Sequence, residues 1–228
     1  MNLKLITMAI YSTYLTNKFG FLLKNAKDKN EQMLLREDYM KALFKKLKIK
    51  VNVINKEKLP QDGKYLLISN HRSIIDPLII ENALIDTNIR GYWVAKKELY
   101  NSFFFGMFTR NAGSILLDRE SKNMSSFFKR LKEVSLGGDC IYIFPEGTRN
   151  KENTPLSSFK EGARIIALKN RLPILPVYIK TNANEVLKEA INKRNRELSI
   201  DIEIGNIIDY KDKTSLEENY RNTFNLGK

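Results

Sequence analysis

The sequence predicts a single α/β domain, with a mixed β-sheet flanked by helices, preceded by an N-terminal segment of two helices. A length of 228 residues suits one domain with a substantial core. Beyond residue 48, short β-rich runs alternate with stretches of helical periodicity, which is typical of a sheet covered by helices. Before that point, two longer stretches are typical of helices. We therefore expect residues 1–48 to form an amphipathic two-helix segment and residues 49–228 to form the α/β domain.

The first helix is expected over residues 2–24. Its most apolar part, residues 5–17, is bracketed by Lys4 and Lys18 and spans only 13 residues, short of the ~18–20 that cross a bilayer. A secretory leader is also disfavoured, because the segment lacks a basic start and a small-residue cleavage site. This helix is expected to lie against a membrane surface or against the core.

The second helix is expected over about residues 30–48. Apolar residues recur there at helical spacing while lysines line another face: Met40, Leu43, Phe44 and Leu47, then Lys41, Lys45 and Lys48. Residues 1–58 contain 13 Lys and Arg against 5 Asp and Glu, so this end carries +8 of the net charge of +13. A solvated helix face is the alternative, but two adjacent helices with concentrated charge favour a membrane surface.

The α/β domain is expected to alternate strands and helices along its length. We predict strands at residues 50–54, 65–69, 92–95, 115–117, 140–144, 174–179 and 199–204. Helices are predicted at residues 77–86, 97–111, 121–136, 157–171, 183–195 and 214–225. The chain has no internal repeat and no Gly-rich phosphate loop of the usual spacings, so a nucleotide-binding fold has little support.

The composition limits the chemistry. A net charge of +13 favours a polyanionic partner such as anionic lipid, nucleic acid or an acidic carrier protein. The single cysteine, Cys140, excludes an intramolecular disulfide and agrees with a reducing compartment. With one histidine and one cysteine, a metal site is not expected.

That one histidine, His71, follows the predicted strand at residues 65–69. Catalytic groups of α/β sheets collect at the carboxyl ends of strands. Asp76 and Pro77 resemble a helix start, with Asp76 as N-cap and proline at the first helical position. In the alternative interpretation, Asp76 is simply a helix cap and His71 is simply a polar residue of the turn. Their spacing across a tight loop also allows the carboxylate to hold one imidazole tautomer, and a capping carboxylate can do both.

A second polar cluster follows the predicted strand at residues 140–144, in Phe144-Pro145-Glu146-Gly147-Thr148-Arg149-Asn150. Glu146 and Arg149 could simply pair with each other. In the same way, Arg119 could pair with a neighbouring acid on the surface. Four collinear motifs argue for a shared functional site instead.

The first of these motifs, His71 to Asp76, resembles the His-x4-Asp motif of the glycerolipid acyltransferases, in particular the 1-acyl-sn-glycerol-3-phosphate acyltransferase family. Further blocks of that family are similar, in order, to Ala95–Leu99 with Gly106 and Gly113–Arg119, to Phe144–Arg149, and to Pro173–Val177, with Phe159–Ala163 between the last two. The resemblance covers residues 59–180. Any one block is weak evidence, but four in order are a strong signal.

The resemblance implies transfer of an acyl group from a thioester to the sn-2 hydroxyl of 1-acylglycerol-3-phosphate, giving phosphatidic acid in phospholipid biosynthesis. The residue chemistry agrees, because neutral His71, held by Asp76, can act as general base on the hydroxyl. Backbone N–H groups around Gly147 are candidate oxyanion donors. The substrate phosphate requires cations and polar partners, which we assign to Arg119, Arg149, Lys96, Thr148 and Glu146.

The expected partners are an anionic membrane surface, lysophosphatidic acid, and acyl-CoA or acyl carrier protein, with no cofactor and no nucleic acid. The expected location is the cytoplasmic face of the membrane. Phe103, Phe104 and Phe105 belong either to the core or to an acyl-chain groove or membrane-dipping face. Ser73 and Cys140 are disfavoured as covalent nucleophiles, so direct transfer is preferred.

Two alternatives remain. The same chemistry could act on another lysolipid, such as a lyso-ornithine lipid or a lysophospholipid. A basic nucleic-acid-binding protein would also explain the charge, but no zinc-ligand, RNA-recognition or recognition-helix pattern supports it.

Overall fold

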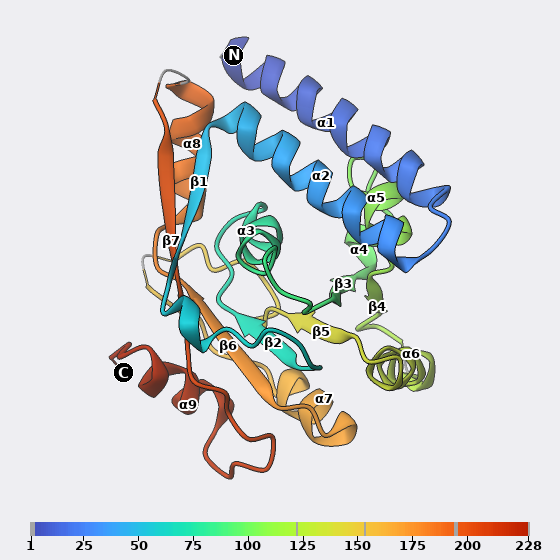
Figure 1. Cartoon of the computed structure of the whole chain (residues 1–228), viewed down its shortest axis with the longest axis vertical. Coiled ribbons are helices and arrows are strands. Elements are labelled where there is room, and N and C mark those ends of the chain that lie inside the picture. Colours follow the sequence, from blue (N-terminus) through green and yellow to red (C-terminus); the bar gives the residue numbers. More distant parts are fainter. Residues whose placement is uncertain (1–2, 122, 153, 194–195, 228) are drawn as a thin grey trace.

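A seven-stranded mixed sheet forms the centre of the molecule (Figure 1). The computed structural model describes residues 3–121, 123–152, 154–193 and 196–227. The strands are β1 (Ile49–Ile54), β2 (Leu66–Ser69), β3 (Gly91–Lys96), β4 (Ile115–Leu117), β5 (Cys140–Ile143), β6 (Ile174–Ile179) and β7 (Leu198–Ile204), in the order β1-β7-β6-β2-β5-β3-β4.

The sheet is mixed because one of its strand pairs is antiparallel. Strands β6, β2, β5, β3 and β4 are parallel to one another, whereas β7 runs antiparallel to β6 and pairs with β1 in parallel. The residues of the central strand β2 pack on both faces of the sheet: Leu67 belongs to one hydrophobic cluster, while Leu66 and Ile68 belong to the other. Alternate residues of a strand point to opposite faces, so both faces must be covered. The prediction of a mixed sheet flanked by helices is confirmed.

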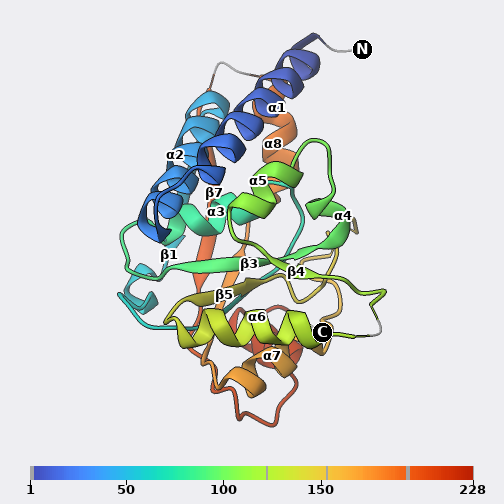
Figure 2. The same ribbon diagram turned by 90° about the vertical axis from the view of Figure 1, so that its right-hand side faces the viewer.

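Helices cover both faces (Figure 2). Helices α1 (Leu3–Lys24), α2 (Lys29–Leu47), α3 (Asp76–Ala83) and α8 (Ala183–Asn192) contribute to one cluster. Helices α6 (Ser125–Leu136), α7 (Gly162–Asn170) and α9 (Leu216–Thr223) contribute to the other. The shorter α4 (Lys97–Tyr100) and α5 (Gly106–Asn111) connect β3 to β4, and a 3-10 turn, η1 (Lys56–Lys58), follows β1.

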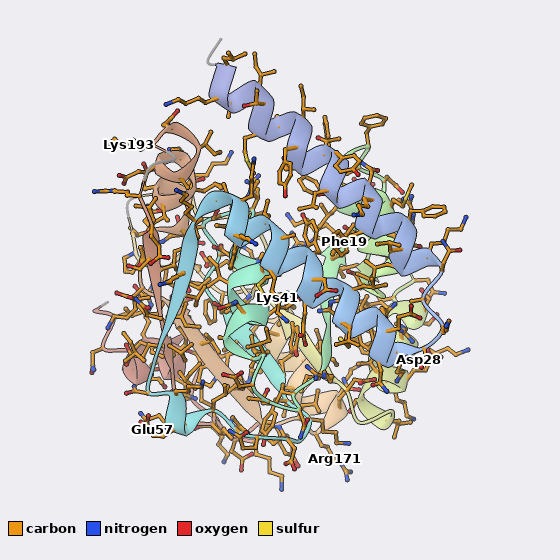
Figure 3. The ribbon with its side chains drawn as sticks, turned by 45° about the horizontal axis from the view of Figure 1, so that its top comes forward. Phe19, Asp28, Lys41, Glu57, Arg171 and Lys193 are labelled. Carbon is orange, nitrogen blue, oxygen red and sulfur yellow. The ribbon has the colours of Figure 1, made fainter. Side chains whose placement is uncertain are left out.

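The two N-terminal helices pack against the domain. Figure 3 shows Phe19 between α1 and α2, where its ring meets Tyr39 with centroids 5.7 Å apart. Helix α2 begins at Asp28, whose side chain accepts from the N–H of Glu31 at 2.8 Å, the usual way in which a free N–H of a first turn is satisfied. Its buried apolar face contains the predicted positions Met40, Leu43, Phe44 and Leu47. No helix among the described residues combines the length and apolar character that a membrane crossing requires.

Some predicted boundaries were wrong. The single helix expected at residues 97–111 is two short helices, with Phe103, Phe104 and Phe105 in the exposed turn between them. The helix expected at residues 157–171 begins only at Gly162, because the chain before it is needed to meet Glu146 and Glu217. Asp76 is the first residue of α3 instead of its N-cap, which is Ile75. The ends of two predicted helices, at residue 122 and residues 194–195, lie outside the described residues.

Candidate active site

Four neighbouring parallel strands deliver the predicted site residues to one edge of the sheet. His71 follows β2, Lys96 ends β3, Arg119 follows β4, and residues 146–149 follow β5. Since β2, β5, β3 and β4 are adjacent and parallel, their carboxyl ends meet at the same edge. The fold therefore gathers residues that are up to 78 positions apart in the sequence.

His71 and Asp76 form the expected pair. The ring Nδ1 lies 2.9 Å from Asp76 Oδ2, and the Asp76 side chain is only 1% exposed. The same carboxylate oxygen also accepts the backbone N–H of Arg72 at 2.6 Å and of Ser73 at 2.7 Å. These two bonds fix the position of the carboxylate. The Asp76 carboxylate therefore keeps the proton of the neutral ring on Nδ1 and leaves Nε2 free to accept a proton.

Two residues of the 144–150 loop hold the backbone of His71. Its N–H donates to Glu146 Oε1 at 2.6 Å, and its carbonyl accepts from the N–H of Asn150 at 2.7 Å. The other Glu146 oxygen accepts from the N–H of Ser157 at 2.9 Å and from the Ser157 hydroxyl. Burial raises the pKa of Glu146 above its ordinary value, against these hydrogen bonds, which lower it.

Both carboxylate oxygens of Glu146 are thus occupied by the protein, and the side chain is buried. The negative charge of an ionised Glu146 would also repel a phosphate. These contacts disfavour the predicted role of Glu146 as a phosphate ligand and favour a role in positioning His71.

Two stacked aromatic rings support the imidazole. The His71 ring lies on Phe144 with centroids 4.0 Å apart and an interplanar angle of 9°. Phe144 lies in turn on Trp93, at 4.6 Å and 19°. The ring of His71 is therefore fixed by Asp76 at one edge and by Phe144 on one face.

Three cations gather beside this pair. Burial and the charges of Arg119 and Arg149 lower the pKa of Lys96, against an opposing effect of Glu98. Lys97 points elsewhere, with Nζ 2.7 Å from Asp118. Like charges held at one rim repel each other, so an anion bound among them would be favourable.

Gly147 controls how closely Arg119 approaches this rim. The Arg119 Nη2 donates to the Gly147 carbonyl at 3.1 Å, and a Cβ at Gly147 would lie 2.5 Å from that nitrogen. Gly147 also has φ of +72°, which favours glycine. The N–H of Gly147 already donates to the Phe144 carbonyl at 2.9 Å, and this hydrogen bond disfavours the predicted role of that N–H as an oxyanion donor.

A cavity of about 630 Å³ joins these groups to an apolar channel. One part is lined by His71, Lys96, Arg119 and residues 147–149, which include Thr148. The other runs between α3 and α5 towards α2, where it is lined by Leu78, Phe105, Phe108 and Tyr39, with Arg36 and Glu81. The site can accept an amphiphile with an anionic head and an apolar chain.

The sequence did not identify the residues that anchor the end of β2. The Asn70 amide exchanges two hydrogen bonds with Ile179, at 2.8 Å to its N–H and 3.1 Å to its carbonyl. The Tyr220 hydroxyl accepts from the Asn70 N–H at 3.2 Å and donates to the Val177 carbonyl at 2.7 Å. In the sequence, only the position of Asn70 next to His71 pointed to this anchoring role, and nothing pointed to Tyr220.

The two rejected nucleophiles lie apart from the groove. Cys140 is the first residue of β5, so it lies at the end of the strand away from residues 146–149. Burial raises the pKa of its thiol to about 12. Ser73 is fully buried in the loop before α3. In the described part of the chain, no group of three or more His, Cys, Asp and Glu residues could hold a metal ion.

A His–Asp pair beside a cationic rim and an apolar channel has the geometry that general-base chemistry on an anionic amphiphile requires. The comparisons narrow this class of chemistry. The chain belongs to the acyltransferase family, because the family model named Acyltransferase matches residues 50–180, more than half of its length. The resemblance predicted from the four sequence blocks is thereby confirmed.

Curated relatives carry more specific names. The chain is 40% identical over 129 residues to a 1-acyl-sn-glycerol-3-phosphate acyltransferase of Helicobacter pylori (strain J99 / ATCC 700824), covering 55% of this chain and 53% of that protein. It is 34% identical over 129 residues to the Bacillus subtilis (strain 168) protein of the same name, covering 55% of this chain and 60% of that one. The matched part thus spans between half and two thirds of these relatives' lengths.

The fold has a solved counterpart. The crystal structure of the 1-acyl-sn-glycerophosphate (LPA) acyltransferase, PlsC, from Thermotoga maritima matches with a TM-score of 0.70 and 23% identity. The match covers 96% of this chain and 91% of that chain, so it includes the N-terminal helices. At this identity the likeness concerns the fold alone.

Proposed function

We propose that this protein transfers an acyl group from an acyl thioester to the sn-2 hydroxyl of 1-acylglycerol-3-phosphate, giving phosphatidic acid. The observation that carries the proposal is the His71–Asp76 pair, 2.9 Å apart, which lies in one groove with Lys96, Arg119 and Arg149. The names of the curated relatives support the same reaction. A lysolipid phosphate would lie among the cations, and its chain would extend along the apolar walls.

The reaction needs one base and no covalent enzyme intermediate. His71 Nε2 takes the hydroxyl proton as the oxygen attacks the thioester carbonyl. The tetrahedral adduct expels the thiolate, which receives the proton from His71, while Asp76 stabilises the imidazolium between the two steps. Buried Ser73 and distant Cys140 support direct transfer.

Arg119, Arg149 and Lys96 bind the acceptor phosphate, with Thr148 beside them at the mouth of the groove. A guanidinium suits this role because its planar fork can donate two hydrogen bonds to one phosphate. Gly147 admits Arg119 to this position, and Glu146 positions His71. The donor is acyl-CoA or acyl carrier protein, both of which carry negative charge that suits a basic protein.

The protein works at an anionic membrane surface, on its cytoplasmic face. Helix α1 supports this, because Leu3, Ile10, Tyr14 and Phe21 share the face opposite its buried residues and are each 60% or more exposed. The side chain of Phe103, 86% exposed, lies in the turn before α5. The Asn111 amide of α5 donates to the Gly20 carbonyl of α1 at 2.9 Å, so the turn and the helix belong to one packed unit. Phe21 lies between Lys18 and Lys24, and exposed apolar side chains beside lysines are typical of an interfacial helix.

The test is acyl transfer to a panel of acceptors by the purified protein, with His71→Ala and Asp76→Asn as inactive controls. We expect 1-acylglycerol-3-phosphate to be preferred and the histidine variant to lose roughly 10²–10⁴-fold in rate. Ser73→Ala and Cys140→Ser should retain most of the rate. Preference for a lyso-ornithine lipid or a lysophospholipid would show that the acceptor is that lysolipid instead of 1-acylglycerol-3-phosphate. An inactive but folded Cys140→Ser with an active His71→Ala would contradict direct transfer.

A further inference from the structure

The chain contains one histidine and one tryptophan, and the fold places them at the two ends of one ring stack. Trp93 is therefore the outermost of the three rings and sets the position of Phe144, on which His71 lies. What holds Trp93 in place also determines where the imidazole lies.

Trp93 is held by a buried ion pair. Its indole Nε1 donates to Glu81 Oε1 at 2.8 Å, and the same oxygen accepts from Arg36 Nη2. Arg36 Nη1 donates to the carbonyl of Gly91, at the start of the strand that carries Trp93, at 2.8 Å. The side chains of Arg36 and Glu81 are 5% and 13% exposed, so their contacts are shielded from water.

The same ion pair reaches the other half of the catalytic pair. Glu81 and Asp76 lie on the same eight-residue helix, α3. Arg36 lies on α2, so it ties α2 to α3 and to β3 at one point. One side chain of the N-terminal segment is thus connected to His71 through Trp93 and Phe144, and to Asp76 through α3.

We propose that Arg36 and Glu81 are positioning residues for the His71–Asp76 pair, acting through Trp93 and Phe144; the kinetic part of this proposal rests on the proposed function. A buried ion pair is weak evidence for stability, since apolar residues of similar size often replace one without loss. Its value here is geometric, because it gives the indole N–H a fixed acceptor. The N-terminal helices therefore contribute to the geometry of the active site as well as to its surroundings.

The kinetic test uses Arg36→Met/Glu81→Met, which removes both charges so that neither is left buried alone. We expect a folded protein whose kcat falls roughly 10- to 100-fold, since a displacement of about 1 Å can cost about 10²-fold. The loss should fall on kcat more than on KM, because neither residue contacts a reacting group, although both line the apolar part of the cavity. Trp93→Phe should lower kcat in the same way and add nothing to the double variant, because both break the same connection.

Arg90→Met is the matched control. Arg90 Nη1 lies 3.3 Å from Glu37 Oε1, so this pair also ties α2 to the start of β3, and among the described residues no hydrogen bond or ion pair joins it to Trp93 or α3. It should keep the wild-type kcat. A wild-type kcat in Arg36→Met/Glu81→Met, or an equal loss in Arg90→Met, would overturn the proposal.

A second readout needs no activity. The indole N–H of the single tryptophan and the ring Cε1–H of the single histidine each give one NMR signal, which needs no further assignment. Both signals should shift in Arg36→Met/Glu81→Met and neither in Arg90→Met. If the indole signal moves and the imidazole signal does not, the connection to His71 is wrong. If both move and the wild-type protein transfers no acyl group to any lysolipid, the positioning stands and the proposed function fails.

Discussion

Three backbone-directed carboxylate contacts around His71 show how much of this site is built from single hydrogen bonds. Glu146 accepts from the His71 N–H, and Asp76 accepts from the N–H groups of Arg72 and Ser73 while it holds the ring. Each carboxylate is buried, so its hydrogen bonds offset part of the loss of water, although Asp76 Oδ1 is buried without a hydrogen-bond partner. Changes at these residues should alter geometry and pH dependence together.

The cation rim predicts a selective effect on the acceptor. Arg149→Ala and Arg119→Ala should raise the KM for the acceptor much more than the KM for the donor, because the lost contact is with the acceptor phosphate. Lysine should rescue each only in part, since it lacks the planar fork. Steady-state kinetics with each substrate varied in turn is the measurement. Equal effects on both substrates would place the phosphate elsewhere.

The raised pKa of Glu146 predicts a pH effect on stability. The folded protein holds this proton to a higher pH than the unfolded chain, whose glutamates titrate near 4.3. Between the two pKa values the folded state binds more protons, so wild-type stability falls as pH rises through this window. The stability of Glu146→Gln relative to wild type should therefore increase from pH 4 upwards. Urea denaturation across this range measures it, and a flat or falling difference would contradict the assignment.

At the scale of elements, α1 has two apolar faces with different roles. One face buries Met8, Leu15, Phe19 and Leu23 against the domain, and the opposite face exposes Leu3, Ile10, Tyr14 and Phe21. This explains why a sequence pattern alone could not choose between membrane and core. The structure shows the core contact, and the membrane contact stays a prediction.

Substitutions on the two faces should separate these roles. Ile10→Ser/Tyr14→Ser/Phe21→Ser should keep the melting temperature and weaken binding to anionic vesicles, including the part that salt does not remove. Phe19→Ala on the buried face should cost about 3–5 kcal/mol of stability, as for other buried phenylalanines. Vesicle co-sedimentation over a salt series and thermal unfolding are the measurements. Unchanged vesicle binding of the triple variant would refute interfacial anchoring by this face.

Deleting residues 1–48 would not test membrane anchoring by itself. It would remove Arg36 and leave Glu81 buried without its partner, and it would uncover the apolar contacts of Leu43, Phe44 and Leu47. The burial of these residues favours loss of folding over release of an intact domain. Whether residues 49–228 form an independent domain stays a prediction that this deletion tests.

At the scale of the whole molecule, the proposed anion site can exist only after folding. Its three cations follow three different strands, β3, β4 and β5, and come together when those strands pair. A ligand that binds only the folded state stabilises it by mass action. The site should therefore be detectable as stability, independently of catalysis.

Inorganic phosphate should raise the melting temperature. At about ten times its Kd the gain is about 1.4 kcal/mol, or roughly 3–6 °C for a chain of this size. Potassium chloride at equal ionic strength should give less, and Arg119→Ala/Arg149→Ala should lose the difference. Lys132→Ala, an exposed lysine of α6, is the matched control and should keep it. A phosphate gain that survives the double arginine change would refute this site.

Local sequence patterns determined much of this protein. Periodicity located all seven strands to within a residue or two, because a buried strand such as β2 needs apolar side chains wherever it lies. The short motif from His71 to Asp76 could be interpreted in the same way, since five residues across a tight turn limit where both side chains can go. The order of the family blocks indicated which residues would share a site.

Only the tertiary structure decided which distant residues touch. Glu146 is 75 positions from His71, and Arg36 is 45 positions from Glu81, so no local period relates them. The strand order, with β7 and β1 reversed, depends on how two faces of a sheet are covered by helices from both ends of the chain. Contacts of this kind follow from the packing of the whole core, which is why the contacts of Arg36, the hydrogen bonds of Tyr220 and the orientation of Glu146 could not be predicted from the sequence.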